Sequence, residues 1–182
     1  MVHEEMNNVD LAIADLTDAI KINPTYYVVY EDRAKLYEKK GEIIKAKQDY
    51  LQIAKIFTTT PDYNFDKGWN YDVVCRYYSL AGELDKAEPI CNNREILTGP
   101  SSRGEYDFYT SRGFWYFHKA KYEESIVDFS KAIEINPFET PDSELFSLRA
   151  KAYRKLGKIE LAIADEKKAK EIEDKDKTTS PF

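Results

Sequence analysis

Few side chains in this 182-residue chain could do chemistry beyond binding, and the strongest candidates are Cys75, Cys91, His3 and His118. A nucleophilic cysteine needs a histidine or another cationic group beside it, and nothing close in sequence would activate either thiol. Two cysteines outside a C-x-x-C motif are also too few for a disulfide framework. We therefore expect both cysteines to be reduced thiols in the core.

His118 lies beside Trp115 and Phe117, and only Tyr122 stands four residues on. A metal site would need a second ligand at that spacing or a cluster of carboxylates. We therefore expect His118 to have a packing or surface role. The one compact glycine-containing loop, TGPSSRGE, lacks the spacing of a phosphate-binding loop. The sequence predicts no catalytic residue, no metal and no cofactor, and we expect the protein not to be an enzyme.

Charge and hydropathy exclude further classes of function. The formal net charge is −6, which disfavours nucleic acid and anionic membranes as partners. No apolar run approaches the roughly 20 residues of a membrane-spanning helix. The first residues, MVHEEMNNVD, do not resemble a secretory signal. We expect a cytoplasmic protein.

The elements that position these residues are encoded by sequence segments that repeat along the chain. AIADLTDAIKINP, which ends at Pro24, returns 113 residues later as SIVDFSKAIEINP, and AIADEKKAKEIED is a third copy. Four companion segments begin with an aromatic residue and share one spacing of small residues and tyrosine. Their aromatic residues are Tyr30, Tyr71, Tyr109 and Phe146. Steps of three and four residues place the shared positions on one helical face, so each segment predicts a helix.

The second half of each segment predicts a turn and a second helix. A tyrosine is followed after four residues by a turn residue and after nine by a small residue that lets the second helix approach closely. The turn residues are Gly41, Gly82, Ala120 and Gly157, and the small ones are Ala46, Ala87, Ser125 and Ala162.

This pattern resembles the tetratricopeptide repeat (TPR), a helix–turn–helix unit of about 34 residues. The resemblance implies one all-α domain over 1–182, a right-handed solenoid of antiparallel helix pairs. Its repeats would span about 27–60, 68–101, 106–139 and 143–176, after a half repeat at about 8–26 and before a polar tail at 177–182. Cys75 and Cys91 would then occupy interior positions.

The two ends of the predicted solenoid differ. The segment EKKAKEIEDKDK gives the C-terminal end a polar cap, with Glu166 in the position that Phe129 has one repeat earlier. At the other end, a helix from Val9 to Ile22 carries leucine and isoleucine without its own partner helix. Either its partner helix precedes the given sequence, or another chain, including a second copy, covers the open face.

The resemblance implies that the first helix of each repeat lines a concave groove that holds a peptide or a partner helix. The predicted groove residues are Val28, Glu31, Lys35, Trp69, Asp72, Arg76, Asp107, Thr110, Phe114, Phe117, Glu144, Ser147 and Lys151. Trp69 and Phe114 are the best anchors, because large exposed aromatic rings are costly unless they bind. Alternatively, Trp69 packs on a loop and Phe114 on a neighbouring helix.

One partner class of the family can be tested on the residues. Repeats that bind the acidic C-termini of heat-shock chaperones grip two carboxylates with Lys, Asn and Arg. Here Asp32, Trp69 and Val73 stand at three of those positions, so we reject that class. The sequence predicts a non-catalytic scaffold that binds another protein. The alternatives are a self-assembling module that uses the N-terminal half repeat, and a regulatory fragment of a larger enzyme or of a secretion or assembly machine.

Overall fold

The protein is an array of α-helices that follow one another along an open arc. The computed structural model describes residues 2–61, 70–97, 104–138 and 141–179, with side chains from residue 8 to residue 175 apart from 96 and 97 within these ranges. Its helices are α1 (Val2–Ile22), α2 (Tyr27–Lys39), α3 (Ile43–Thr59), α4 (Tyr71–Ala81), α5 (Leu84–Cys91), α6 (Arg94–Leu97), α7 (Glu105–His118), α8 (Tyr122–Ile135), α9 (Ser143–Lys155) and α10 (Ile159–Thr179). The described residues contain no strand.

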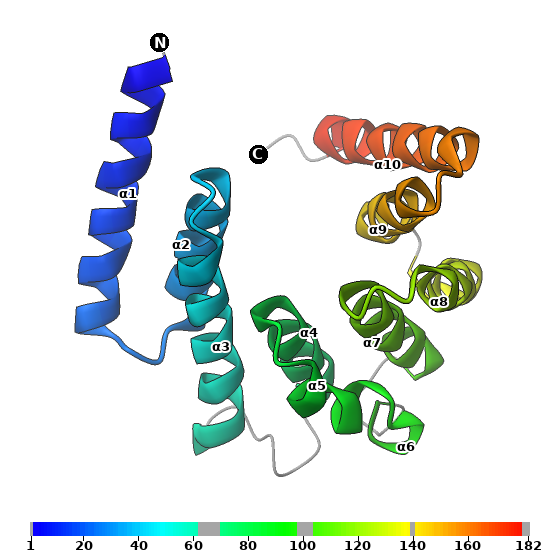
Figure 1. The fold of residues 1–182 in the computed structure, drawn as a ribbon, viewed down its shortest axis with the longest axis horizontal. Coiled ribbons are helices and arrows are strands. Elements are labelled where there is room, and N and C mark those ends of the chain that lie inside the picture. Colours follow the sequence, from blue (N-terminus) through cyan, green and yellow to red (C-terminus); the bar gives the residue numbers. More distant parts are fainter. Residues whose placement is uncertain (1, 62–69, 98–103, 139–140, 180–182) are drawn as a thin grey trace.

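Figure 1 shows α1 at one end of the arc and α10 at the other, with α4 and α7 on its inner side and α5 and α8 outside them. The antiparallel pairs are α2 with α3, α4 with α5, α7 with α8, and α9 with α10, and α1 packs on α2. The predicted all-α solenoid of helix pairs is therefore confirmed.

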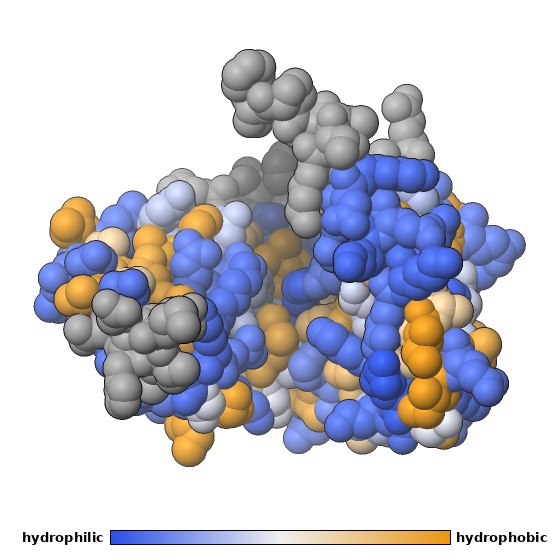
Figure 2. All heavy atoms as spheres, turned by 90° about the horizontal axis from the view of Figure 1, so that it is seen from above, coloured by the Kyte–Doolittle hydropathy of each residue, from blue (hydrophilic) through white to orange (hydrophobic). Residues whose placement is uncertain are grey.

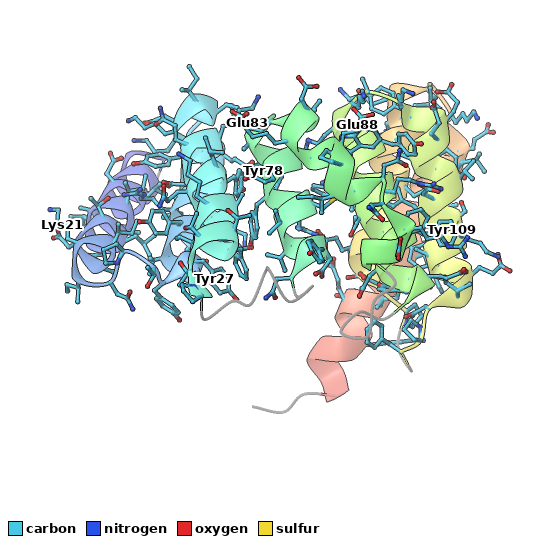
Figure 3. All side chains as sticks on the ribbon, turned by 90° about the horizontal axis from the view of Figure 1, so that it is seen from below. Lys21, Tyr27, Tyr78, Glu83, Glu88 and Tyr109 are labelled. Carbon is cyan, nitrogen blue, oxygen red and sulfur yellow. A yellow bond between two sulfur atoms is a disulfide. The ribbon has the colours of Figure 1, made fainter. Side chains whose placement is uncertain are left out.

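The same turn closes each pair. In all four turns the residue after the predicted turn position donates its backbone N–H to the carbonyl of the predicted tyrosine, the bond typical of a Schellman motif. These bonds run from Glu42 to Tyr37 (2.8 Å), from Glu83 to Tyr78, from Lys121 to Tyr116 and from Lys158 to Tyr153 (2.9 Å each). Figure 3 shows Glu83, in one of these turns, and Tyr27, at the start of α2, at opposite edges of the solenoid. The turns thus form one edge, and the starts of the first helices form the other.

Small residues let the two helices of a pair touch. The predicted small residues at the start of each second helix are all buried, with Ala46 at 1% exposure and Ala87, Ser125 and Ala162 at 0%. Gly113 in α7 shows why size matters, because a Cβ atom there would lie 2.9 Å from the ring of Phe129 in α8. A larger residue at this position would force the helices apart.

A buried ion pair joins the two helices in three of the four pairs. Each arginine donates two hydrogen bonds to an aspartate that follows 16 residues later and is at most 7% exposed. The pairs are Arg33 with Asp49, Arg112 with Asp128, and Arg149 with Asp165, at 2.7–2.9 Å. Arg33 also bonds Thr17 in α1, and Arg149 bonds Ser130 in α8, so these arginines connect successive repeats as well.

The remaining pair, α4 with α5, is joined differently, and here the sequence-based expectation was wrong. Val74 and Ile90 stand where the other pairs have arginine and aspartate. The next residues, Cys75 and Cys91, form a disulfide with their Cα atoms 5.2 Å apart. Both were expected to be reduced thiols. The expectation that they are interior residues holds, since both are 0% exposed and pack with Trp115 of α7.

The first helix also differs from expectation, in the residue at which it begins. Helix α1 begins at Val2, not at Val9, and packs Leu16 and Ile20 against the core of α2 and α3 while leaving Leu11 62% exposed. In α10, Glu166 is exposed as expected of a polar end, where it pairs with Arg154.

Candidate binding groove

A hollow on the inner side of the arc is the candidate functional site. It has a volume of about 500 Å³ and is lined mainly by α2, α4 and α7, with residues from α3, from the segment before α9 and from the start of α9. Figure 2 looks into this side of the molecule and shows a hollow near its middle, with hydrophobic colour at the floor and hydrophilic side chains around it. The volume lies within the range of small-ligand pockets.

Aromatic side chains form much of the wall. Those that line the hollow are Tyr27, Phe57, Tyr77, Tyr106, Phe114 and Phe138. At one end Tyr27 of α2 packs on Phe57 of α3, with ring centroids 4.9 Å apart. At the other end Tyr106 of α7 meets Phe138 edge to face at 5.5 Å. These rings offer a ligand apolar contact area that is already held in place.

Carboxylates lie among these rings. The described lining residues include five of them, Glu31, Asp72, Asp107, Asp142 and Glu144, against one cation, Arg76. Asp142 accepts a hydrogen bond from the Tyr106 hydroxyl at 2.6 Å and caps α9 by accepting from the backbone N–H of Glu144. Tyr106, Asp142 and the first turn of α9 thus form one hydrogen-bonded arrangement.

Glu31 remains ionised. Its partial burial raises the pKa of the carboxyl, but hydrogen bonds from Lys35 and Tyr77 outweigh burial, and the pKa lies below its usual range. The effect on Tyr77 is the reverse, because burial and then the negative charge of Glu31 raise the pKa of its hydroxyl. At neutral pH the pair is therefore a carboxylate and a neutral phenol, which places a negative charge at the α2 side of the groove.

Arg76 reaches across the groove. It extends from α4 to Glu144 of α9, 68 residues away, and its guanidinium carbon lies 4.9 Å from the ring centre of Phe114 in α7. Burial lowers the pKa of Arg76, but the pairing with Glu144 raises the pKa by a larger amount, so the guanidinium stays charged. The groove thus contains an arginine bound by an aromatic face and a carboxylate, both from the chain itself.

The predicted groove residues fall into three groups. Glu31, Asp72, Arg76, Thr110 and Phe114 line the hollow, as do Asp107 and Glu144. Five others do not line it: Val28, Lys35, Phe117, Ser147 and Lys151. Lys35 is an exposed partner of Glu31, Lys151 is exposed, and Phe117 packs on Tyr122 of α8. Val28 and Ser147 are half-buried. Trp69 lies outside the described residues.

The structure places Phe114 closer to the alternative in which its ring packs on a neighbouring helix than to the prediction of an exposed binding anchor. Only 5% of its surface is exposed, and it belongs to a core cluster with Phe129 and Leu148. Arg76 and His118 cover its ring. A ligand would meet Phe114 as part of the floor beneath Arg76.

The sequence analysis missed several lining residues: Tyr27, Phe57, Tyr77, Tyr106, Phe138 and Asp142. Tyr106 precedes a predicted groove residue, Asp107, and the first turn of α7 exposes both to the hollow. Phe138 follows an Asn-Pro helix end and comes from a connection that the helical periodicity does not describe. Only the folding of that connection against α7 brings it to the site.

Two searches of the described residues bear on other kinds of site. No group of three or more His, Cys, Asp and Glu side chains there could hold a metal ion. None of the described helices combines the length and the apolar character needed to cross a bilayer.

Comparison with known families and structures gives one consistent result. The family model described as tetratricopeptide repeat matches residues 1–26, 106–139 and 143–176, just over half of the chain. A tetratricopeptide repeat protein from Parabacteroides merdae is similar in structure, with a TM-score of 0.54 and 21% identity over 94% of this chain. The match covers 61% of that protein, so this chain spans less than two thirds of its length.

A second solved structure is similar to the same extent. A thermophilic TPR protein from Thermus thermophilus matches with a TM-score of 0.53 and 19% identity, over 93% of this chain and 85% of that one. At these identities the two structures support the fold alone.

Proposed function

Because the chain belongs to the tetratricopeptide repeat family, whose members are in general protein-interaction scaffolds without catalytic activity, we propose that it holds a peptide segment or a helix of a partner protein in its concave groove. The observation that carries this proposal is the hollow of about 500 Å³ on the inner side of the arc, with aromatic walls from several successive helices. A few residues carry most of the binding free energy at protein interfaces, and Tyr and Trp are enriched among them. The net charge of −6 supports a protein partner in preference to nucleic acid or an anionic membrane.

Site-specific photo-crosslinking tests this proposal. A photoreactive amino acid would replace Asp72, Val73 or Thr110, which line the hollow, and Ile44 or Val127 as exposed control positions outside it, at 77% and 68% exposure. We expect one partner to crosslink from the groove positions and not from the controls. Equal capture from both sets would contradict the proposal.

Self-assembly through the N-terminal helix is a second candidate. Leu11 and Ile22 on α1 are 62% and 85% exposed, which favours an apolar contact at this end. Light scattering during size-exclusion chromatography would show a dimer or larger species that the substitutions Leu11→Glu and Ile22→Lys dissociate. A strict monomer at high concentration would exclude this candidate.

A regulatory fragment of a larger enzyme or assembly machine stays a proposal without an observation of its own. A cytoplasmic location is likewise a proposal, and the Cys75–Cys91 disulfide opposes it, since disulfides are rare in reducing compartments. Thiol labelling of the protein in its native cells would decide between the two. Labelling of both cysteines under denaturing conditions would support the cytoplasm, and protection until a reductant is added would support an oxidising compartment.

A further inference from the structure

We propose that copies of this protein associate head to tail, with α1 of one copy packed in parallel on α10 of the next copy. This inference rests on the self-assembly candidate above, and it names the surface of the second copy that covers α1. Because the contact joins two different surfaces of the chain, each copy still has one free end, and assembly continues beyond a dimer.

Helix α1 has one side that the described residues leave uncovered. Its other side carries Leu16 and Ile20, which pack on the core of α2 and α3. The uncovered side is a stripe of exposed residues in alternating steps of three and four: Asn8, Leu11, Asp15, Asp18 and Ile22. This spacing is that of the seam between two packed helices, so the stripe has the pattern of a surface that another helix covers.

Asp15 in this stripe indicates that the covering surface carries cations. The repeated segments place Asp15 where the second helices of two other pairs have Asp128 and Asp165. Those two aspartates are buried, and each accepts hydrogen bonds from an arginine of the first helix of its pair. Asp15 is exposed and forms no ion pair among the described residues. A cation of a second copy would supply the partner that the equivalent aspartates have.

The open side of α10 has the complementary composition. Helix α10 packs on α9 through the side that carries Asp165, whereas Ile159 and Ile163 on another side are 46% and 53% exposed. Lys167 and Lys170 follow them on that side, both exposed and without an ion pair among the described residues. The open side of α10 therefore offers apolar contact area next to two cations.

The two stripes match residue by residue when the helices run parallel. Each contains an apolar residue, a charged residue four positions later and a second charged residue three positions after that. The matched residues are Leu11 with Ile163, Asp15 with Lys167, and Asp18 with Lys170. Because every residue of an α-helix adds the same rise and rotation, equal steps place these residues opposite one another. Asp18 already pairs with Lys21, but both side chains are about 70% exposed, so that pair is weak and can be exchanged.

The architecture of the repeats favours the parallel orientation. The two helices of each pair are antiparallel, so the second helices of successive repeats run in the same direction. Helix α1 is the second helix of the half repeat and α10 is the second helix of the last repeat, and Figure 1 shows them at opposite ends of the arc. A copy added at the end of another therefore continues the array with α1 parallel to α10.

Charge favours this contact over a contact between two α1 helices. The formal net charge of −6 opposes the association of copies unless their contact surfaces are complementary. Helix α1 contains five acidic residues and one lysine, whereas α9 and α10 together contain nine basic and eight acidic residues. Two α1 helices would bring like charges together, and α1 on α10 brings the aspartates of one stripe to the lysines of the other.

Sedimentation velocity and light scattering over a range of protein concentrations test the inference. We expect the weight-average mass to rise past that of a dimer as the concentration increases. The mass should fall as salt rises, because screening weakens the exposed ion pairs. A mass that levels off at the dimer, or an assembly that salt strengthens, would overturn the head-to-tail arrangement.

Charge reversal at either end locates the contact. Asp15→Lys with Asp18→Lys changes the stripe of α1, and Lys167→Glu with Lys170→Glu changes the stripe of α10. Each pair of substitutions alone should raise the concentration at half assembly by roughly tenfold or more, because two attractions become repulsions. All four substitutions in one chain restore opposite charges and should return assembly to near the native level. Failure of this rescue would contradict the proposed register.

A matched control separates the contact from the net charge. Lys39→Glu with Lys55→Glu changes the net charge as much as the α10 variant does, at exposed positions of α2 and α3. We expect this control to assemble like the native protein, and circular dichroism to show native helicity in every variant. An equal loss of assembly in the control and in the α10 variant would overturn the inference.

The outcomes also separate this inference from the self-assembly candidate. If Leu11→Glu with Ile22→Lys dissociates the assembly and the α10 variant does not, α1 mediates self-assembly through another surface and the head-to-tail contact is wrong. If the native protein is a strict monomer at every concentration, both fail. Neither result bears on the groove, because the residues of the two stripes do not line the hollow.

Discussion

At the scale of single residues, the turn inside each helix pair requires a left-handed backbone conformation. Gly41, Gly82 and Gly157 have φ of 76°, 81° and 71°, and in the third pair Ala120 adopts the same conformation with φ of 58°. A Cβ atom makes this conformation unfavourable by about 1–2 kcal/mol, whereas glycine adopts it freely. The α7–α8 pair therefore carries a local cost that the other pairs avoid.

Ala120→Gly should stabilise the protein. We expect the free energy of unfolding to rise by about 0.5–1 kcal/mol, because the relief of strain exceeds the greater entropy of glycine in the unfolded chain. Urea denaturation monitored by circular dichroism measures the change. Gly157→Ala, at the equivalent position of the last pair, should lower stability by a similar amount. A loss of stability in Ala120→Gly would show that this turn is not strained.

His118 is a second residue with a local cost. Burial, and then the positive charges of Arg76, Lys47 and Lys151, lower the pKa of its imidazole from 6.5 to about 4. Its ring packs between those of Phe114 and Phe117, in line with the predicted packing role. At neutral pH the imidazole is uncharged in the folded protein.

This pKa predicts a pH dependence of stability. Between pH 6.5 and 4 the unfolded chain binds a proton at His118 that the folded protein does not, so stability falls as the pH falls through that window. By pH 5 the loss amounts to about 2 kcal/mol relative to pH 7.5. His118→Gln should reduce the difference in free energy of unfolding between pH 7.5 and pH 5 by about that amount. An unchanged pH profile in the variant would mean that His118 titrates normally.

At the scale of helix pairs, the chain solves one packing problem in two ways. Three pairs use a buried arginine–aspartate pair with a separation of 16 residues, and α4–α5 uses the Cys75–Cys91 disulfide with the same separation. Helix α5 is also short, at 8 residues, and contains Pro89, which removes one backbone hydrogen bond. A covalent link in this pair compensates for a second helix that has fewer turns to pack.

Loss of the disulfide should weaken the whole protein. We expect the variant Cys75→Ala with Cys91→Ala to lose about 3 kcal/mol of unfolding free energy, since the bond closes a loop of 16 residues in the unfolded chain. A reducing agent should destabilise the native protein and leave the variant unchanged, as measured by thermal melting. Equal melting temperatures of native protein and variant under oxidising conditions would contradict a stabilising role for the bond.

At the scale of the whole molecule, the curvature of a solenoid follows from contacts between neighbouring repeats. Arg76 adds a contact of another kind, because it joins α4 to α9 across α7 through its bonds to Glu144. Both side chains are partly exposed, at 39% and 50%, so the pair should contribute little to stability. It can still restrain how far the arc opens.

Arg76→Met should open the arc without unfolding it. We expect a larger radius of gyration in small-angle X-ray scattering and a change in unfolding free energy below about 1 kcal/mol. Arg154→Met is the matched control: it breaks an ion pair of similar exposure, 47% and 44%, that lies within one repeat. An equal change in both variants would mean that the Arg76–Glu144 pair does not restrain the curvature.

The repeat itself could be predicted from the sequence, because each repeat uses the same local interactions. Spacings of three and four residues define the helix faces, and the positions of the tyrosine and of the turn residue define the turns, as the bond from Glu83 to Tyr78 shows. None of these features depends on residues far away in the chain. The periodicity also assigned Glu31, Asp72, Arg76 and Thr110 to the groove-facing side of their helices, and all four line the hollow.

Only the tertiary structure decided what depends on contacts between residues of different helices. The disulfide required Cys75 and Cys91 to meet across a helix pair, the ion pair of Arg76 spans 68 residues, and Phe138 reaches the hollow from a connection without helical periodicity. The same holds for which charged residues reach the hollow, because Lys35 and Lys151 share the predicted face but do not line it. Sequence periodicity specifies the direction of a side chain from its own helix, whereas the curvature of the assembled repeats determines which side chains converge.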